Sequence, residues 1–283
     1  MLSRSARTRF SRDMGGFVVF LNMPGWLLKR PTDHGHGALA MVVESILHPG
    51  RHIAMHEHRN DEIISWVPAG VMRHDDKSSG QLLTDVGHLM VMNAGRSFWH
   101  SEETLPSDPH LRMLQILVRP RAVDLEPNIQ HGEVKPAAQN TWRHLVGPEG
   151  GSAPFFVRNT IDFFDIRLDA GARSDFPSAQ GRDLYFIVFT GAIGVGGQHF
   201  GEAEQGLIIG RDRTSLEAHQ PSVVVAFIID PDAVVTRQGT VGDTKEIPPP
   251  SVIRTIQALQ SLGLGWILPA LNRLRLLLST RRT

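Results

Sequence analysis

The chain reads MHEHRNDE at residues 55–62 and MNAGRSFWHSE at residues 92–102, and these two stretches carry its strongest structural signal. Side chains alternate between the two faces of a β-strand, so His56 and His58 share one face and Glu57 lies on the other. Two imidazoles on one strand face form half of a potential metal site.

The second stretch supplies the other half by the same geometry. His100 and Glu102 fall on one face of a strand, and the alternation turns Glu103 away from them. Together the two stretches predict four metal ligands, three imidazoles and one carboxylate.

A His-x-His pair is weak evidence by itself in a chain with 14 histidines, and His34 and His36 form another such pair. We interpret that pair as part of a loop, because the surrounding DHGHG has turn character and no strand to orient the rings. Only His199 and His219 lie beyond residue 144. Chemistry that depends on histidine is therefore expected in the first half.

The composition of the chain excludes several classes of function. Lys plus Arg and Asp plus Glu are both 29, so no net charge attracts nucleic acid, and we expect no direct nucleic-acid binding. The absence of cysteine excludes disulfides, thiolate metal sites and cysteine nucleophiles. With 283 residues and 41% hydrophobic residues, the chain is expected to be globular with two domains.

Short β-type runs separated by turn sequences predict an all-β protein. Four runs in the first half and four in the second indicate two similar β units, with a proline-rich join between them. These runs span residues 39–43, 63–67, 89–92, 113–118, 161–168, 184–189, 206–209 and 222–229.

The two ends of the chain differ from the β units. Residues 1–24 are basic, and we predict a flexible N-terminal segment there. A targeting segment is the alternative, which is less favoured because the apolar run at 16–21 is too short to span a bilayer and no cleavage site clearly follows it. A cytoplasmic protein is expected. Residues 246–283 predict a Pro-rich linker and a short helical tail, which packs on its own protein or a second subunit, or lies on a membrane surface. The oligomeric state stays open.

The motif spacing resembles that of the cupin barrel. Gly50, Glu62 and Gly70 surround the first histidine pair, and a similar pattern starting at Gly87 ends at His100. More closely, residues 55–62 and 92–102 resemble the two histidine motifs of the pirin family, and residues 115–127 resemble the segment leading out of its first barrel. Fainter similarity extends the resemblance to about residues 25–245.

Pirins are bicupins, so the resemblance implies two antiparallel β-barrels of jelly-roll type packed face to face. Residues 25–135 would form a metal-binding cupin domain, and residues 136–245 a cupin domain without metal ligands. Carried over residue by residue, the family pattern implies metal ligation by the four residues His56, His58, His100 and Glu102. It places Glu62 near the site as a non-ligand, although in many other cupins this position is a ligand. Four further histidines are expected at the rim or surface: His52, His74, His88 and His110.

Three imidazoles and one carboxylate suit a divalent transition metal. We expect Fe(II) first, with Mn, Co, Ni, Cu or Zn as alternatives, because the Irving–Williams order does not select iron by affinity. Four protein ligands on a six-coordinate ion leave two positions for substrate or dioxygen.

The resemblance also implies a function. Pirins include enzymes that cleave flavonols such as quercetin with O2, so we expect a quercetin 2,3-dioxygenase-like enzyme acting on a small aromatic substrate, with Glu102 as ligand and catalytic base. The alternative is a non-catalytic regulator whose partner binding changes with the redox state of the metal. A structural role with both barrels inert is a third interpretation.

Four positions depart from the pirin pattern without touching the ligands: Glu57 replaces proline, Asn60 and Ser97 replace glycine, and Ile63 replaces threonine. The aromatic N-terminal stretch of the family is largely missing, so the cover over the metal is expected to differ. Five apolar residues near the motifs are candidates either to line the site or to pack in the core: Trp66, Met90, Met92, Phe98 and Trp99.

Overall fold

The computed structural model describes residues 2–5, 11–29, 31–210, 213–243 and 255 of the chain. Over these residues it is nearly all β, with 22 strands in four sheets and one short 3-10 helix, η1 (Pro24–Leu27). The predicted all-β class is confirmed.

The first barrel pairs a seven-stranded sheet with a four-stranded sheet. The larger sheet runs in the order β12 (Asn128–Glu133), β9 (His88–Asn93), β6 (Glu62–Ala69), β11 (Leu111–Val118), β4 (Leu39–Leu47), β3 (Phe17–Asn22) and β2 (Ser11–Asp13). The smaller sheet runs in the order β5 (His52–His58), β10 (Phe98–Glu103), β7 (Met72–Asp76) and β8 (Gly80–Thr84).

The second barrel has the same construction. Its larger sheet runs in the order β1 (Leu2–Ser5), β20 (Gln205–Ile208), β17 (Asp183–Thr190), β22 (Ser222–Ile229), β15 (Ile161–Leu168), β13 (Arg143–Pro148) and β14 (Phe155–Val157). Its smaller sheet contains β16 (Arg173–Asp175), β21 (Ser215–Ala218), β18 (Ala192–Val195) and β19 (Gln198–Gly201).

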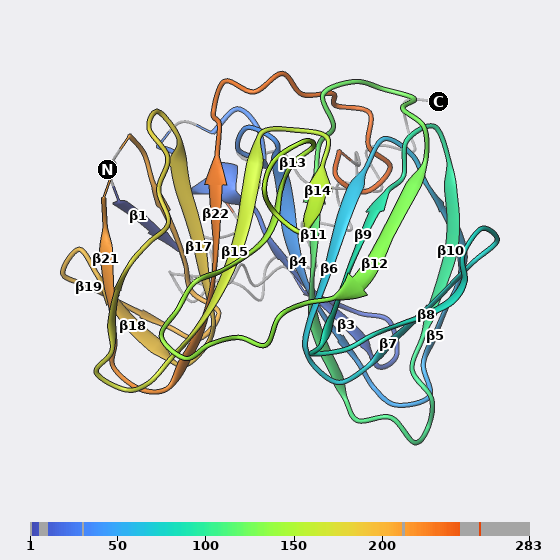
Figure 1. Ribbon diagram of the computed structural model, residues 1–283, viewed down its shortest axis with the longest axis horizontal. Coiled ribbons are helices and arrows are strands. Elements are labelled where there is room, and N and C mark those ends of the chain that lie inside the picture. The colour runs from blue at the N-terminus through green and yellow to red at the C-terminus, as the bar shows by residue number, and fades with distance from the viewer. Residues whose placement is uncertain (1, 6–10, 30, 211–212, 244–254, 256–283) are drawn as a thin grey trace.

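The two seven-stranded sheets face each other in the middle of the molecule, and the smaller sheets lie on the outside (Figure 1). One buried cluster contains side chains from both large sheets, including Trp66 and Leu114 from the first and Phe163 and Phe227 from the second. Trp66 also donates an indole hydrogen bond across the interface to Asp165 Oδ2, at 3.0 Å. The two barrels therefore pack face to face, as the resemblance implied.

This arrangement explains why the sequence predicts the strands of the large sheets. On β6, Ile64 and Trp66 pack against the second barrel, while Ile63 belongs to a cluster of the first barrel alone. Strands buried on both faces read as continuous apolar runs. The smaller sheets expose one face, so their strands carry polar residues and were harder to recognise.

The described residues of the N-terminal segment form strands that pair with both barrels. Residues Leu2–Ser5 pair with β20 of the second barrel, and β2 and β3 extend the large sheet of the first. Ladder hydrogen bonds at the sheet edges satisfy the backbone groups of these residues, a pairing that composition does not reveal. Arg4 also pairs with Glu204 at 2.5 Å.

The C-terminal part of the described chain returns from β22 to the first barrel (Figure 1). The backbone amides of Val241 and Gly242 each donate to Asp61, at 2.9 Å, and Asp243 accepts from the buried Arg119 at 2.8 Å. Apart from Thr255, the predicted helical tail lies outside the described residues. No helix within the described ranges has the length and apolarity needed to cross a membrane.

Candidate metal centre

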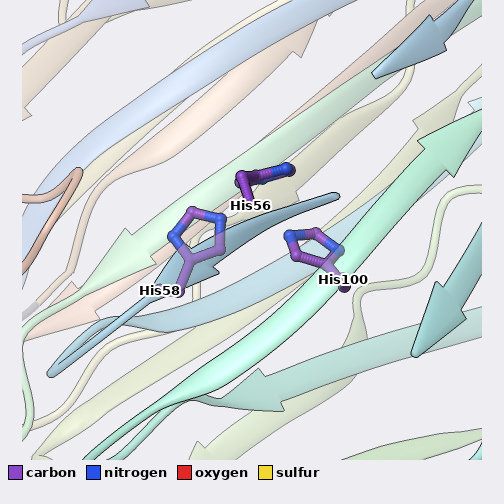
Figure 2. Close-up of side chains that lie close together, drawn as sticks. All are labelled: His56, His58 and His100. Atoms are coloured by element: carbon purple, nitrogen blue, oxygen red, sulfur yellow. The ribbon is translucent and has the colours of Figure 1, made fainter. Parts of the chain in front are cut away.

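Three imidazoles converge on the interior face of the smaller sheet of the first barrel. His56 and His58 lie on β5 and His100 lies on the neighbouring strand β10, directly opposite His56 (Figure 2). The ring centroids of His56 and His100 are 4.4 Å apart, and each lies about as close to His58, at 4.9 and 5.0 Å. One nitrogen of each ring falls within 4.8 Å of the others, close enough to share an ion.

Hydrogen bonding leaves nitrogens free for that ion. His56 Nδ1 lies 2.8 Å from the Ala54 carbonyl, to which it can donate, so its Nε2 keeps a lone pair. His100 Nε2 is buried without a hydrogen-bond partner within the described part of the chain. An unsatisfied buried nitrogen costs about 1–3 kcal/mol, which a bound ion would relieve. The donor set therefore fits a transition metal.

The protonation of these rings also suits metal binding. Burial, followed by the charges of His58 and His56, lowers the pKa of His100 to about 2. Burial likewise lowers the pKa of His56, outweighing the opposing hydrogen bond to Ala54. Both imidazoles are therefore neutral at physiological pH, the form that binds metal ions.

Glu102 is buried on β10, one alternate position beyond His100 on the same interior face. Its carboxylate groups with His100 and His74, and Oε1 is 3.9 Å from His100 Nδ1. Burial raises the pKa of Glu102 to about 7, against the lowering effects of the His58 charge and a Gln115 hydrogen bond. Ligation of a metal by Glu102 together with all three imidazoles stays a prediction.

Sequence reasoning did not identify Gln115 as a site residue. It lies on β11 of the opposite sheet, and its Nε2 donates to both oxygens of Glu102, at 3.0 and 3.1 Å. The available signal was one amide within the apolar run at 113–118, since a buried polar side chain needs a partner. Gln115 thus holds the carboxylate from across the barrel.

His74 was expected at the rim or surface, and this is wrong. It lies on β7 with no exposed surface, and His100 is its neighbour across the sheet interior, with ring centroids 4.8 Å apart. The other three histidines of that group are exposed or half-buried, as expected: His52, His88 and His110.

His34 and His36 belong to neither group of potential metal ligands. His34 Nε2 lies 2.7 Å from the Gly242 carbonyl, and His36 Nε2 lies 2.7 Å from Asp183 Oδ2 in the second barrel. These rings tie loops together rather than converging on a common point, in keeping with the loop interpretation.

Three departures from the pirin pattern have structural explanations. Asn60 adopts a φ of 53°, a left-handed conformation that asparagine tolerates better than most residues, so it can replace glycine. Ser97 Oγ donates to Glu57 Oε1 at 2.5 Å. The two substituted side chains therefore hydrogen-bond to each other, Ser97 directly before β10 and Glu57 on β5.

Of the apolar candidates, Phe98 and Met92 share the buried cluster of the first barrel, and the Phe98 ring lies 6.5 Å from His100. Trp66 packs instead in the interface between the barrels, Trp99 is 48% exposed, and Met90 belongs to a separate cluster. Only the first two can therefore contribute apolar surface beside the imidazoles.

Glu62 belongs to neither group of potential metal ligands, in keeping with the expectation that it is not a ligand. Its carboxylate accepts hydrogen bonds from the backbone amide of Arg158 in the second barrel and from Nδ2 of Asn93 on the neighbouring strand β9. Burial raises the pKa of Glu62 to about 7, more than these hydrogen bonds lower it.

This pKa shift predicts that replacing the Glu62 carboxyl with a neutral amide stabilises the protein more at high pH than at low pH. Between its unfolded pKa of 4.5 and its folded pKa of about 7, Glu62 is ionised only in the unfolded state, so its contribution to stability falls as pH rises. The free energy of unfolding of Glu62→Gln, relative to wild type, should therefore increase from pH 5 to pH 8. Urea titrations at both pH values measure it, and a constant difference would contradict the assignment.

Comparisons with known proteins agree with this architecture. The Pirin family model matches residues 29–118. A protein of Pseudomonas aeruginosa named putative quercetin 2,3-dioxygenase is 28% identical over 206 residues, covering 68% of this chain and 87% of that protein. The quercetin 2,3-dioxygenase of Escherichia coli K12 is 22% identical, covering 71% of this chain and 86% of that protein.

Solved structures share the fold. A bacterial pirin from Escherichia coli in complex with nickel(II) superimposes with a TM-score of 0.71 at 20% identity, covering 81% of this chain and 99% of that one. Oxalate decarboxylase from Bacillus subtilis, at a TM-score of 0.52 and 12% identity, covers 83% of this chain and 78% of that one. With a matching Pirin family model over most of its first barrel, the chain contains a Pirin domain at residues 29–118 and is similar over both barrels to bacterial pirins.

Proposed function

We propose that this protein is a metal-dependent dioxygenase that cleaves flavonol-type substrates such as quercetin with O2. One observation carries the proposal: three converging imidazoles, two with depressed pKa values, lie beside a buried carboxylate whose pKa is raised to about 7. The names of the relatives support the choice of substrate class.

The proposal assigns metal ligation to four residues. His56, His58 and His100 would hold the ion, with Glu102 as fourth ligand. A bound Fe(II), or another divalent transition metal, would supply the Lewis acidity and the electron coupling to dioxygen that side chains lack.

Glu102 would accept the proton of the flavonol 3-hydroxyl. A general base works best when its pKa lies near the operating pH, and burial brings Glu102 to that range. The two hydrogen bonds from Gln115 fix the carboxylate, and the buried cluster that contains Phe98 and Met92 would limit the access of water. The net reaction joins one O2 to the flavonol and releases one carbon monoxide and a depside.

Oxygen uptake tests the proposal. Protein loaded anaerobically with Fe(II) should consume one O2 per quercetin and release one carbon monoxide, faster than the same amount of free Fe(II). Repeating the assay with Mn, Co, Ni, Cu and Zn identifies the active metal. Uptake no faster than with free metal would reject the dioxygenase, and a tightly bound metal without turnover would favour the regulatory alternative.

A further inference from the structure

A buried chain of three side chains leads away from the imidazole cluster. His100 Nδ1 lies 3.1 Å from His74 Nδ1, and His74 Nε2 lies 2.8 Å from Asp76 Oδ2. All three residues are buried, at 2%, 0% and 4% exposed. They lie on two paired strands, β10 and β7, with His100 directly opposite Asp76.

We propose that Asp76 and His74 are positioning residues. They would fix the orientation of the His100 ring and keep its proton on Nδ1, so that the lone pair of Nε2 is available to the metal. The inference rests on the metal site of the proposed function and assigns to this site two residues outside its predicted ligand set.

The position of each proton in this series of hydrogen bonds follows from Asp76, the acceptor at its end. An ionised carboxylate only accepts hydrogen bonds, so the nitrogen beside Asp76, His74 Nε2, carries hydrogen. In a neutral ring the other nitrogen, His74 Nδ1, is then an acceptor. The 3.1 Å contact between the two Nδ1 atoms consequently requires the hydrogen to belong to His100. This leaves Nε2 of His100 unprotonated, and Nε2 is the buried atom without a partner.

Asp76 is itself held in place. Its other oxygen, Oδ1, accepts hydrogen bonds from the backbone amides of Ser78 and Ser79, at 2.7 and 2.6 Å, and from Ser78 Oγ at 2.6 Å. These donors belong to the turn between β7 and β8. The carboxylate therefore has one oxygen fixed by the turn and one oxygen directed at His74.

His74 as a direct ligand is the competing arrangement, since His74, His100 and Glu102 also group closely enough to hold an ion. Such an ion would occupy the Nδ1 atoms that now face each other at 3.1 Å. It would leave His100 Nε2 buried without a partner and would separate His100 from His56 and His58. In the positioning role every ring nitrogen of His100 and His74 has a partner. Metal-bound histidines commonly donate a hydrogen bond from their second nitrogen in this way.

The wild-type protein provides the first test. Loaded with Zn(II) as a diamagnetic probe, it should show in nitrogen-15 NMR of the imidazole rings that His100 is protonated only at Nδ1 and His74 only at Nε2. His74 protonated at Nδ1, or bound to the metal, would overturn the proposal.

Variants test the consequence for metal binding. In Asp76→Asn the side-chain amide donates to His74 Nε2, which reverses the proton order and opposes His100 Nδ1–H. We expect one Co(II) per chain with about 10–100-fold weaker affinity in chelator competition. His74→Phe, which keeps a ring without hydrogen bonds, should behave similarly and keep three coordinated imidazoles in X-ray absorption.

Asp75→Asn is the matched control, because Asp75 is an exposed neighbour on the same strand and the charge change is identical. It should bind Co(II) like wild type. Equal affinities of Asp76→Asn and Asp75→Asn, or loss of one imidazole ligand in His74→Phe, would overturn the positioning role alone. Wild-type protein that binds neither probe ion would overturn this inference and the proposed function together, whereas absence of oxygen uptake would affect only the latter.

Discussion

His58→Ala should abolish metal binding and, with it, quercetin-dependent oxygen uptake. His58 is buried on β5 and closes the imidazole cluster, so its loss leaves two rings to hold the ion. Loss of an outer partner of a ligand already weakens metal affinity by about 10–100-fold, so loss of the ligand itself should exceed ~100-fold. Metal analysis after dialysis and an oxygen electrode measure both effects on one preparation.

The matched control is His52→Ala, at the other end of the same strand. His52 is exposed and pairs in register with Glu103 rather than pointing into the barrel, so its removal should change neither metal content nor turnover. If His34→Ala and His36→Ala removed the metal while His58→Ala did not, the site would be assigned to the wrong pair.

Glu102→Gln should lower turnover about 10²–10⁴-fold, the usual contribution of a positioned general base. The amide keeps the shape of the side chain but cannot take the proton of the flavonol hydroxyl. The three imidazoles remain, so metal should still bind, with reduced affinity from the lost carboxylate. The kcat for quercetin and the metal content per chain separate the two roles, because loss of the base acts on kcat.

Glu103→Gln is the control for this prediction. Glu103 follows Glu102 directly, and it lines a polar pocket on the outer face of the sheet together with His52, Arg73 and Ser101. The substitution should leave turnover unchanged. Full activity of Glu102→Gln, or loss of activity in Glu103→Gln alone, would show that the base lies elsewhere.

These predictions separate the dioxygenase from the regulatory interpretation. Two of the basic residues beside the first barrel, Arg73 and Arg96, form ion pairs with Asp108 and Glu126. A partner that used them would first have to break these pairs. The interior site, by contrast, has a buried nitrogen without a partner that a bound ion would satisfy.

The fold could be predicted largely from sequence because its central strands are buried on both faces. The runs at 63–67, 113–118 and 222–229 correspond to β6, β11 and β22, all in the large sheets. The N-terminal strands could not be predicted in this way, because edge pairing is made by backbone groups of distant segments. Leu2–Ser5, for example, is ordered by β20, about 200 residues away.

Sequence alone determined which residues share a strand face, because alternation is a local property of an extended chain. It placed His56 with His58 and His100 with Glu102. Only the tertiary structure decided what those faces meet: Gln115 reaches Glu102 from the opposite sheet, and His74 with Asp76 lies behind His100. The reason is that strand register and barrel closure bring together segments that are far apart in the chain. The spacing of residues along one strand determines neither of them.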